Sequence, residues 1–391
     1  MKDRTSPNGS GHQLLALLLL SVALTSIAAA GPREQAKRIH DRLAGVPPTE
    51  IVLADMEAAI AMNNPNAAAY LAMQNPNFYN VTLKNFAAPW TNREQSVFVP
   101  MNDYIATVIG MIRDEVPFNT LLSSDILYLG AGNLGLPPYS NSNNSHYEQM
   151  EQQNVDMMTG LVQIPQSSVT GLPPGATAGV MTTRAAAEAF FVAGTNRAMF
   201  RFTLLNHMCN DLEQVHDVRL PPDRIRQDVS RSPGGDSRLF LNNCIGCHTG
   251  MDPMAQAFAY YNFNLVSGSI EYTPGQVQPK YFNNDSNFPF GFVTPDDSWD
   301  NYWRSGQNRF LGWDPGLPGS GNGAKSLGEE LGNSVAFASC QVKKVFRAVC
   351  LRPPENAADR AEVAQLASLF QGGGYNMRET FARAAVYCMG Q

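Results

Sequence analysis

The spacing of apolar residues predicts a mainly helical protein. Apolar positions recur at about 3.6-residue intervals in REQAKRIHDRLAG, TEIVLADMEAAIAM and MNDYIATVIGMIRDEV, which lie between Pro32 and about Val116. A glycine follows the first of these segments as a C-cap, and Thr49 is the expected N-cap of the second. Asn64-Pro65 and Asn75-Pro76 interrupt the pattern as turns. We therefore expect a helical N-terminal region.

Helical periodicity returns in two later stretches. TTRAAAEAFFVAGTNRAMFRFTLLNHMCNDLEQVHD predicts two helices separated near Gly194, and KSLGEELG, SVAFASCQVKKVFRAVC, ADRAEVAQLASLF and MRETFARAAVYC predict four more near the C-terminus. Residues 131–180 are rich in Gly, Pro, Asn and Ser, which predicts a long surface loop with one short helix near Tyr147 to Gln153, suited to a boundary or a lid. Residues 270–322 predict irregular structure with one hairpin.

The first thirty residues have the layout of a secretory signal peptide. Lys2 and Arg4 precede a mostly apolar stretch from Leu14 to Leu24, and small residues end at Ala30. An uncleaved anchor is the alternative, but the apolar run is shorter than the roughly 20 residues that a membrane span needs. No later segment has a long apolar run. We expect a periplasmic or secreted protein that has no stable membrane span after cleavage.

These patterns divide the chain into six parts. They are a signal peptide (1–30), a helical domain (31–130), a loop or linker (131–180), a second helical domain (181–269), an irregular aromatic-rich insertion (270–322) and a helical C-terminal domain (323–391).

Composition narrows the class of function. Hydrophobic residues make up 44% of the 391 residues and charged residues 16%, which is typical of a globular protein. The formal net charge is −6, and the sequence has no dense run of Lys and Arg. Nucleic-acid binding normally needs a basic patch, so we expect no nucleic-acid partner.

We predict that the fourth part is a haem c domain, because it contains the segment Cys244-Ile245-Gly246-Cys247-His248. A c-type haem is attached through two thiols that add to its vinyl groups, and a histidine directly after the second thiol coordinates the iron. With six Cys and six His in the chain, this string is expected by chance on the order of once in a thousand such sequences. The segment predicts one covalent haem c, with Cys244 and Cys247 as attachment residues and His248 as proximal ligand.

Three other interpretations of the paired cysteines remain open. A structural zinc site needs two more Cys or His ligands, commonly a second close pair, and no other C-x-x-C occurs in the chain. A redox pair of the thioredoxin type needs a βαβ context, and a plain structural disulfide is also conceivable. The helical pattern disfavours the redox pair.

The remaining cysteines are Cys209, Cys340, Cys350 and Cys388. Cys340 and Cys350 lie ten residues apart on one predicted helix, about 15 Å along its axis, so they cannot bond to each other. A Cys350–Cys388 bridge between two terminal helices is plausible, and Cys209 and Cys340 then pair or stay free.

The residues around the motif suggest its neighbouring elements. Asp236 is expected to cap a short helix before the motif, and MDPMAQAFAYYNF is expected to form the next helix, with Asp252 as cap and Pro253 in the first turn. The sixth iron ligand must come from a distant segment, because Met251 and Met254 follow His248 too closely. The candidates are Met181, His207, Met208 and His216, of which Met181 is favoured.

Other side chains are weaker candidates for contact with the haem. Arginines could meet the haem propionates, and tryptophans could wall the haem or a ligand cleft, although solvated arginines and packed aromatic rings are the commoner outcomes. These residues are Arg238, Arg304, Arg309, Trp299, Trp303 and Trp313.

The stretch CIGCHTGMDPMAQAFAYYNF is similar to the C-x-x-C-H-x-x-[IM]-D-P segment of large exported cytochrome-like proteins of the planctomycete type. RIHDRLAGVPPT resembles the start of their upstream helical domain, and SVAFASCQVKKVFRAVCLRPP resembles their C-terminal helix. This chain departs from them in its C-terminal cysteines and its longer aromatic insertion. The resemblance implies a haem segment between two helical domains.

These observations predict an exported monohaem c-type cytochrome that carries out single-electron transfer with a redox partner protein. Minimal electron carriers need only about a hundred residues, so the length of the chain leaves two alternatives open. One is a haem enzyme of the peroxidase or oxidase kind with an open distal iron site, covered by residues 131–180. The other is a scaffold or binding module whose haem is structural.

Overall fold

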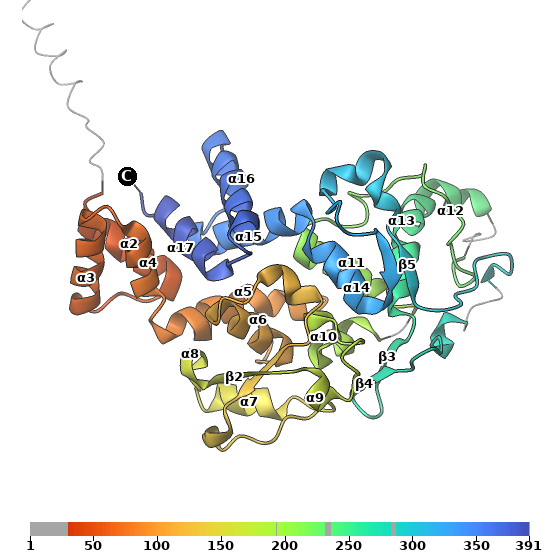
Figure 1. Ribbon diagram of the computed structural model, residues 1–391, viewed down its shortest axis with the longest axis horizontal. Coiled ribbons are helices and arrows are strands. Elements are labelled where there is room, and N and C mark those ends of the chain that lie inside the picture. Colours follow the sequence, from red (N-terminus) through yellow and green to blue (C-terminus); the bar gives the residue numbers. More distant parts are fainter. Residues whose placement is uncertain (1–29, 193, 231–235, 283–286, 391) are drawn as a thin grey trace, which may run out of the picture.

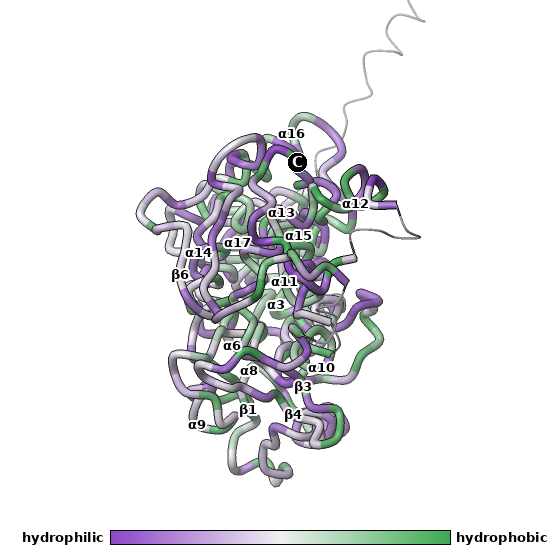
Figure 2. Tube along the Cα trace, turned by 90° about the vertical axis from the view of Figure 1, so that its right-hand side faces the viewer, coloured by the Kyte–Doolittle hydropathy of each residue, from purple (hydrophilic) through white to green (hydrophobic). Residues whose placement is uncertain are grey.

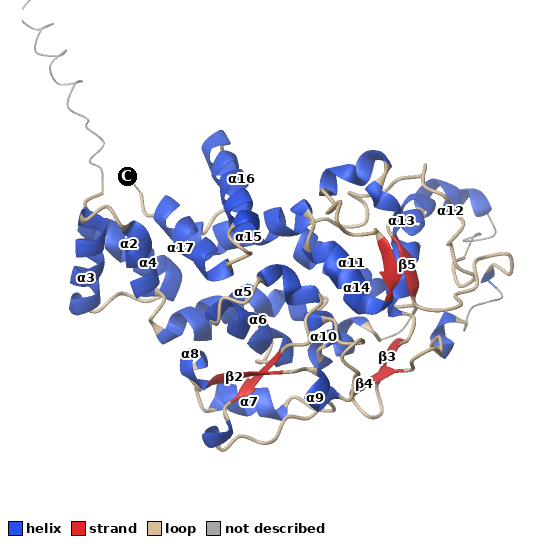
Figure 3. Ribbon diagram, viewed as in Figure 1, coloured by secondary structure: helices blue, strands red, loops and turns tan. Residues whose placement is uncertain are grey.

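Helices make up most of the residues that the computed structural model describes, and the strands among these residues form three short, separate pairs (Figure 1, Figure 3). The structure describes residues 30–192, 194–230, 236–282 and 287–390. The prediction of a mainly α fold is therefore confirmed. The predicted signal peptide, apart from Ala30, lies outside the described residues.

The N-terminal helices begin and end where local sequence signals place them. Gly45 ends the first helix in the left-handed conformation, with φ of 71°, and the Thr49 hydroxyl accepts a hydrogen bond from the Val52 amide at 3.3 Å. Asn64 caps a helix through its side chain, with Pro65 in the first turn. These elements are α2 (Pro32–Ala44), α3 (Glu50–Ala61), α4 (Pro65–Ala72), a π-helix (Phe78–Leu83), α5 (Lys84–Ala87) and α6 (Asp103–Arg113).

Residues 131–180 contain more regular structure than the predicted surface loop. Strand β1 (Leu127–Gly130) pairs antiparallel with β2 (Leu161–Ile164), and the chain between and after them forms α7 (Ser145–Gln152), α8 (Met157–Gly160) and α9 (Ser167–Thr170). His146 links α7 to β1, because its Nε2 accepts a hydrogen bond from the Gly130 amide at 2.9 Å. The glycines and prolines separate short packed elements, which a local reading of turn residues cannot distinguish from a loop.

The central region holds α10 (Arg184–Phe190), α11 (Arg197–Met208), α12 (Ser237–Asn243) and α13 (Ile245–Ala255). Asp236 caps α12, as predicted, by accepting a hydrogen bond from the Arg238 amide. The predicted helix start at Asp252 is wrong, because α13 runs through Asp252 and Pro253 and ends at Ala255. The Asp252 carboxylate pairs with Arg197 and His248 and therefore does not begin a helix.

The predicted aromatic-rich insertion contains short strands and the 3-10 helices Pro279–Tyr281, Tyr302–Arg304 and Gly306–Leu311, and most of its other described residues are irregular. Strand β3 (Tyr261–Asn264) pairs with β4 (Ser269–Tyr272), and β5 (Ser298–Asp300) pairs with β6 (Ser320–Asn322). The structure thus contains two strand pairs in and beside this region, where the sequence predicted one hairpin.

The C-terminal helices return to the N-terminal ones. They are α14 (Gly323–Gly332), α15 (Val335–Cys350), α16 (Ala357–Gly372) and α17 (Met377–Tyr387). Helix α17 packs against α2 and α4, which places both ends of the described chain at the same side of the molecule (Figure 1). Buried side chains from Ala36 to Ala385 form one continuous apolar cluster. Among the described residues, no helix is both long and apolar enough to cross a membrane.

Four cysteines pair across the fold. The predicted Cys350–Cys388 bridge is present, with the two Cα atoms 5.5 Å apart, and it links the end of α15 to the end of α17. Cys209 and Cys340 form a second bridge with a Cα separation of 5.2 Å, which joins the end of α11 to α15. Both bridges therefore fix α15 to segments that are distant in the sequence.

We expect the Cys350–Cys388 bridge to contribute substantially to stability, because it closes a long loop in the unfolded chain. Replacing both cysteines by alanine should lower the free energy of unfolding by about 2–4 kcal/mol, measured by urea denaturation. The difference from the wild type should shrink when both proteins are reduced. Equal unfolding curves under oxidising conditions would contradict this expectation.

Candidate haem attachment site

The motif residues share one face of α13. Cys244 is the residue between α12 and α13, and its carbonyl accepts the amides of Cys247 and His248 at 3.2 Å each. At about 100° per residue, Cys244, Cys247 and His248 fall within a narrow arc, whereas Gly246 points the opposite way. The side chains of Cys244, Cys247 and His248 lie in half-buried positions. The helix thus presents two thiols and one imidazole together at a partly accessible face.

Two glycines allow close packing on the opposite face of α13. A Cβ on Gly246 would lie 2.3 Å from Cδ2 of His216, and a Cβ on Gly250 would lie 2.0 Å from Nε1 of Trp303. The neighbouring backbone is also joined there, because the Asp217 amide donates to the Gly246 carbonyl at 3.0 Å. His216, one of the candidate sixth ligands, therefore lies behind the helix that carries His248.

The two motif thiols are unpaired, and they are the only free cysteines in the described chain. The Cys247 thiol donates to the Leu212 carbonyl at 3.5 Å, and burial, together with the nearby Glu213 charge, raises the pKa of Cys247. The four remaining cysteines are used in disulfides, so they offer no thiolate for a zinc site. Within the described ranges, no group of three or more His, Cys, Asp or Glu is arranged to hold a metal ion.

The imidazole of His248 is held through one nitrogen. Its Nδ1 lies 3.1 Å from Oδ2 of Asp252, one helical turn further along α13. An ionised carboxylate only accepts hydrogen bonds, so Nδ1 carries the proton and the lone pair of the neutral ring lies on Nε2. In the described part of the chain, Nε2 has no hydrogen-bond partner. This is the arrangement in which a histidine is oriented for a metal by a second residue.

Asp252 is fully buried and ion-paired. Arg197 donates to both carboxylate oxygens of Asp252, at 2.8 and 3.2 Å, and Nη2 of Arg226 lies 3.7 Å from Oδ1. Burial opposes ionisation of the carboxyl, but the charges of Arg197 and Arg226, together with the hydrogen bond from His248, outweigh it and hold the pKa of Asp252 far below its usual range. Asp252 is therefore a permanent anion behind His248.

Asp228 completes the charged group. Arg197 donates to its carboxylate at 2.7 and 3.0 Å, and Arg226 lies 3.6 Å from it. The Thr195 hydroxyl accepts from Arg226 at 2.8 Å and donates to Asp228 at 3.2 Å. Two arginines thus face two aspartates, which is how a buried charge cluster stays compensated.

Apolar side chains cover the start of the motif. Phe240 of α12 lies beside the His248 ring, with ring centroids 5.8 Å apart, and it forms a small cluster with Ile225 and Val229 that packs on Cys244 and Ile245. Helix α12 lies at the edge of the molecule and carries hydrophobic as well as polar residues (Figure 2). Leu239 and Leu241 of this helix are 46% and 52% exposed, so apolar surface remains open next to the motif.

The other candidate sixth ligands lie in the core. Met181 is 2% exposed and lines a small cavity with Trp90, Tyr104 and His207. The described contacts of Met181 include none with Cys244, Cys247 or His248, so its assignment as sixth ligand remains a prediction without a supporting contact. His207 is engaged through Nε2, which lies 2.6 Å from the Tyr104 hydroxyl. Met208 is buried.

The arginines and tryptophans named from the sequence mostly have structural partners. Arg238 pairs with Asp236, and Arg304 pairs with Glu330. Trp303 is fully buried against Gly250, and Trp299 donates to Ser326. Packing of the aromatic rings, the commoner outcome for such residues, therefore describes Trp299 and Trp303.

Sequence reasoning missed the charged residues behind the motif. Along the sequence Asp252 has the features of a helix cap, and no local pattern marks Arg197, Arg226 or Asp228 as part of the site. The spacing of four between His248 and Asp252 places both side chains on one helix face and could have indicated their pairing. The other three lie too far away in sequence for any local signal.

Comparisons with known proteins give no family for this chain. No family model matches it, and searches of curated proteins and of solved structures return no significant match. The interpretation of the site therefore depends on its own residues.

The two glycine contacts give a matched pair of variants. Gly250→Ala should destabilise the protein by about 1–3 kcal/mol, because the buried Trp303 indole cannot move away from the new methyl group. Gly246→Ala meets the exposed His216 ring, which can rotate, and an alanine also favours the helix, so its stability should be unchanged or slightly higher. Thermal unfolding of both variants tests this, and equal losses of stability would contradict it.

Proposed function

We propose that this chain is an exported c-type cytochrome that binds one haem covalently at Cys244 and Cys247, with His248 as the proximal iron ligand. The observation that carries the proposal is the shared, half-buried face of α13, where two unpaired thiols lie beside an imidazole whose Nε2 is free and whose Nδ1 is held by Asp252. The other four cysteines are paired with each other, which supports a distinct role for this pair.

The residues fit such a group in three respects. Cys244 and Cys247 offer thiols for two thioether bonds, and His248 offers one nitrogen lone pair. Phe240 and the exposed leucines of α12 offer apolar contacts. Bound haem would supply one-electron exchange at its iron. The chain's own contribution is to fix the imidazole and to place the Asp252 anion behind it.

Single-electron transfer to a redox partner protein is the function favoured by the exposure of the motif. Electron exchange between proteins needs a cofactor near the surface, and the cysteine and histidine side chains here are partly accessible. Export is part of the proposal, because haem attachment of this type and disulfide bonds both belong to oxidising compartments.

A haem enzyme is the second candidate, and the His248–Asp252 contact favours it. A carboxylate that accepts a hydrogen bond from the Nδ1–H group makes the imidazole a more basic ligand than a backbone carbonyl acceptor would. A basic proximal ligand stabilises higher oxidation states of iron, which suits catalysis with an open distal position. Rapid carbon monoxide binding by the reduced protein would favour the enzyme, and its absence would favour the electron carrier.

Covalent haem attachment can be tested directly. The full chain is expressed with a cytochrome c maturation system, and haem that stays with the denatured protein is measured as the pyridine haemochrome. We expect one covalent haem per chain, and none after Cys244→Ser combined with Cys247→Ser. The matched control is Cys350→Ser combined with Cys388→Ser, which should keep the haem. A wild-type protein without covalent haem, matured beside a working cytochrome, would refute the proposal.

The role of Asp252 can be tested by the reduction potential of the haem-loaded protein. Asp252→Asn removes a buried negative charge behind His248, so the oxidised iron loses stabilisation and the potential should rise by on the order of 50–100 mV. Asp228→Asn perturbs the same arginines without touching His248, and should shift the potential less. Equal shifts in the two variants would mean that Asp252 acts through net charge and not through His248.

A further inference from the structure

A cleft beside the C-terminal end of α11 contains a group of cations that form no salt bridge with the described residues. The cleft measures about 560 Å³ and lies between the ends of α11 and α15. Its charged wall consists of Lys343, Lys344 and Arg347, all from α15. None of these three forms a salt bridge with any described residue. In a chain of net charge −6, three unpaired cations in one cleft are a notable local excess of positive charge.

Lys344 is the innermost of the three. Its Nζ lies 4.4 Å from the centre of the Trp90 ring, and this contact is its one recorded polar interaction with the described residues. Burial lowers the pKa of Lys344 to about 7. Lys344 is half-buried and has no carboxylate beside it, so an anion in the cleft would stabilise its charged form.

Lys280 shows how this protein satisfies a buried lysine. Its Nζ donates to the Phe191 carbonyl at 2.8 Å, to Asn196 Oδ1 at 2.6 Å and to Asn262 Oδ1 at 2.9 Å. Lys280 therefore uses all three of its donors inside the protein. Lys344 Nζ, by contrast, donates no hydrogen bond to a described residue, so its three donors are available to a ligand in the cleft.

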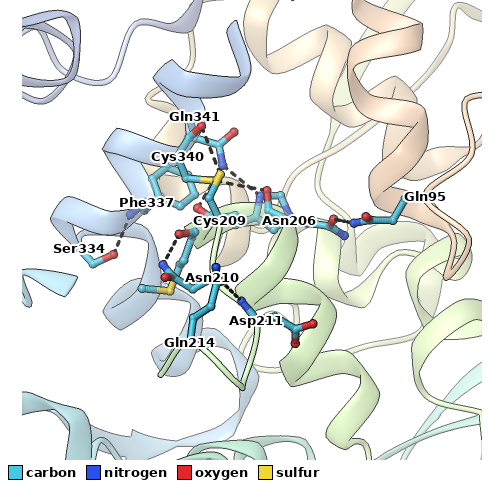
Figure 4. The surroundings of a disulfide bond; sticks show 12 residues. Gln95, Asn206, Cys209, Asn210, Asp211, Gln214, Ser334, Phe337, Cys340 and Gln341 are labelled. Atoms are coloured by element: carbon cyan, nitrogen blue, oxygen red, sulfur yellow. Dashed lines mark hydrogen bonds between the residues drawn. A yellow bond between two sulfur atoms is a disulfide. The ribbon is translucent and has the colours of Figure 1, made fainter. Parts of the chain in front are cut away.

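The rest of the cleft suits a small polar ligand. Amide side chains of Gln95, Asn206 and Gln214 line it, and they gather around the Cys209–Cys340 bridge (Figure 4). Three prolines, Trp90, Leu205 and Cys209 form the remaining wall, and no lining residue is acidic. The bridge holds the end of α11 against α15, so the two helix segments that carry Asn206 and the three cations keep their relative position before any ligand arrives. Preformed sites of this kind lose little entropy on binding.

We propose that this cleft binds a small organic or inorganic oxyanion that carries at least two negative charges, with Lys344 as its central contact. Lys343 and Arg347 are exposed and would attract the anion, whereas Lys344 would form the desolvated ion pair. Arg347 has the planar donor geometry that suits carboxylate or phosphate oxygens. The proposal concerns a second site and does not depend on the haem.

The ionisation of Lys344 provides a signature for this site. Only its protonated form offers a charge, so binding should weaken as the pH rises through about 7. The groups around it are His207 from α11, Trp90 from the segment before α6, and Lys343 and Arg347 from its own helix. Burial and the Lys344 charge keep the pKa of His207 well below its usual range, so His207 stays neutral.

Isothermal titration calorimetry of the full chain with citrate and with pyrophosphate tests the proposal and separates carboxylate from phosphate ligands. We expect saturable binding of at least one of them at pH 6. Between pH 6 and pH 8, the affinity of the wild type should fall about tenfold more than the affinity of Lys344→Met. Because the ligands titrate equally in both experiments, the difference between the two proteins reports on Lys344 alone. Lys344→Met should weaken binding at pH 6 at least tenfold, and Arg347→Gln severalfold.

The matched control is Lys37→Gln, which removes one positive charge from exposed α2 and should leave binding unchanged. Thermal unfolding of each variant shows that it is folded. Absence of saturable binding of both anions at pH 6 would overturn the proposal. An equal loss in Lys37→Gln and Lys344→Met would also overturn it, because net charge and not the cleft would then govern binding.

Discussion

The structure around the motif depends on one buried carboxylate. Asp252 lies between an imidazole on one side and two arginines on the other, with its side chain fully enclosed. An isolated carboxylate in such a place would cost several kcal/mol, so the arginines are needed for it to stay ionised. Because Asp252 is ionised, the proton of His248 is fixed on Nδ1 and Nε2 is left available. The chemistry of the helix face therefore depends on residues that lie behind it.

This arrangement connects elements that are far apart in the sequence. Arg197 opens α11, Arg226 and Asp228 precede α12, and Asp252 lies near the end of α13. The glycines of α13 complement the ion pairs, because they let His216 and Trp303 approach the opposite face of the helix. The helix is thus fixed from two sides, by charge on one and by close packing on the other. A fixed helix is what a site with three required side-chain positions needs.

Local sequence signals predicted much of the fold. Thr49, Asp236 and Gly45 act as caps at the expected helix ends, since a cap satisfies backbone groups within a few residues of itself. Helix geometry excluded a Cys340–Cys350 bridge, because these residues are too far apart on one helix, and the Cys350–Cys388 bridge expected between two terminal helices is present. Local signals failed at Asp252, where a residue type that commonly begins helices lies inside one. They failed again in much of residues 131–180, where turn residues connect packed elements, although the short helix expected near Tyr147 is present as α7.

By itself, the sequence determined the helical class, several helix ends, and the motif with its three residues at one-turn spacing. These features depend on residues within a few positions of one another. Only the tertiary structure decided which cysteines stay unpaired, what holds His248, and where the cations of α15 meet a cleft. Each of these depends on distant segments brought together, and the energy of a buried charge is set by its neighbours in space. The sequence alone does not distinguish a buried aspartate from an N-cap aspartate, because the two differ only in the partners that the fold places around them.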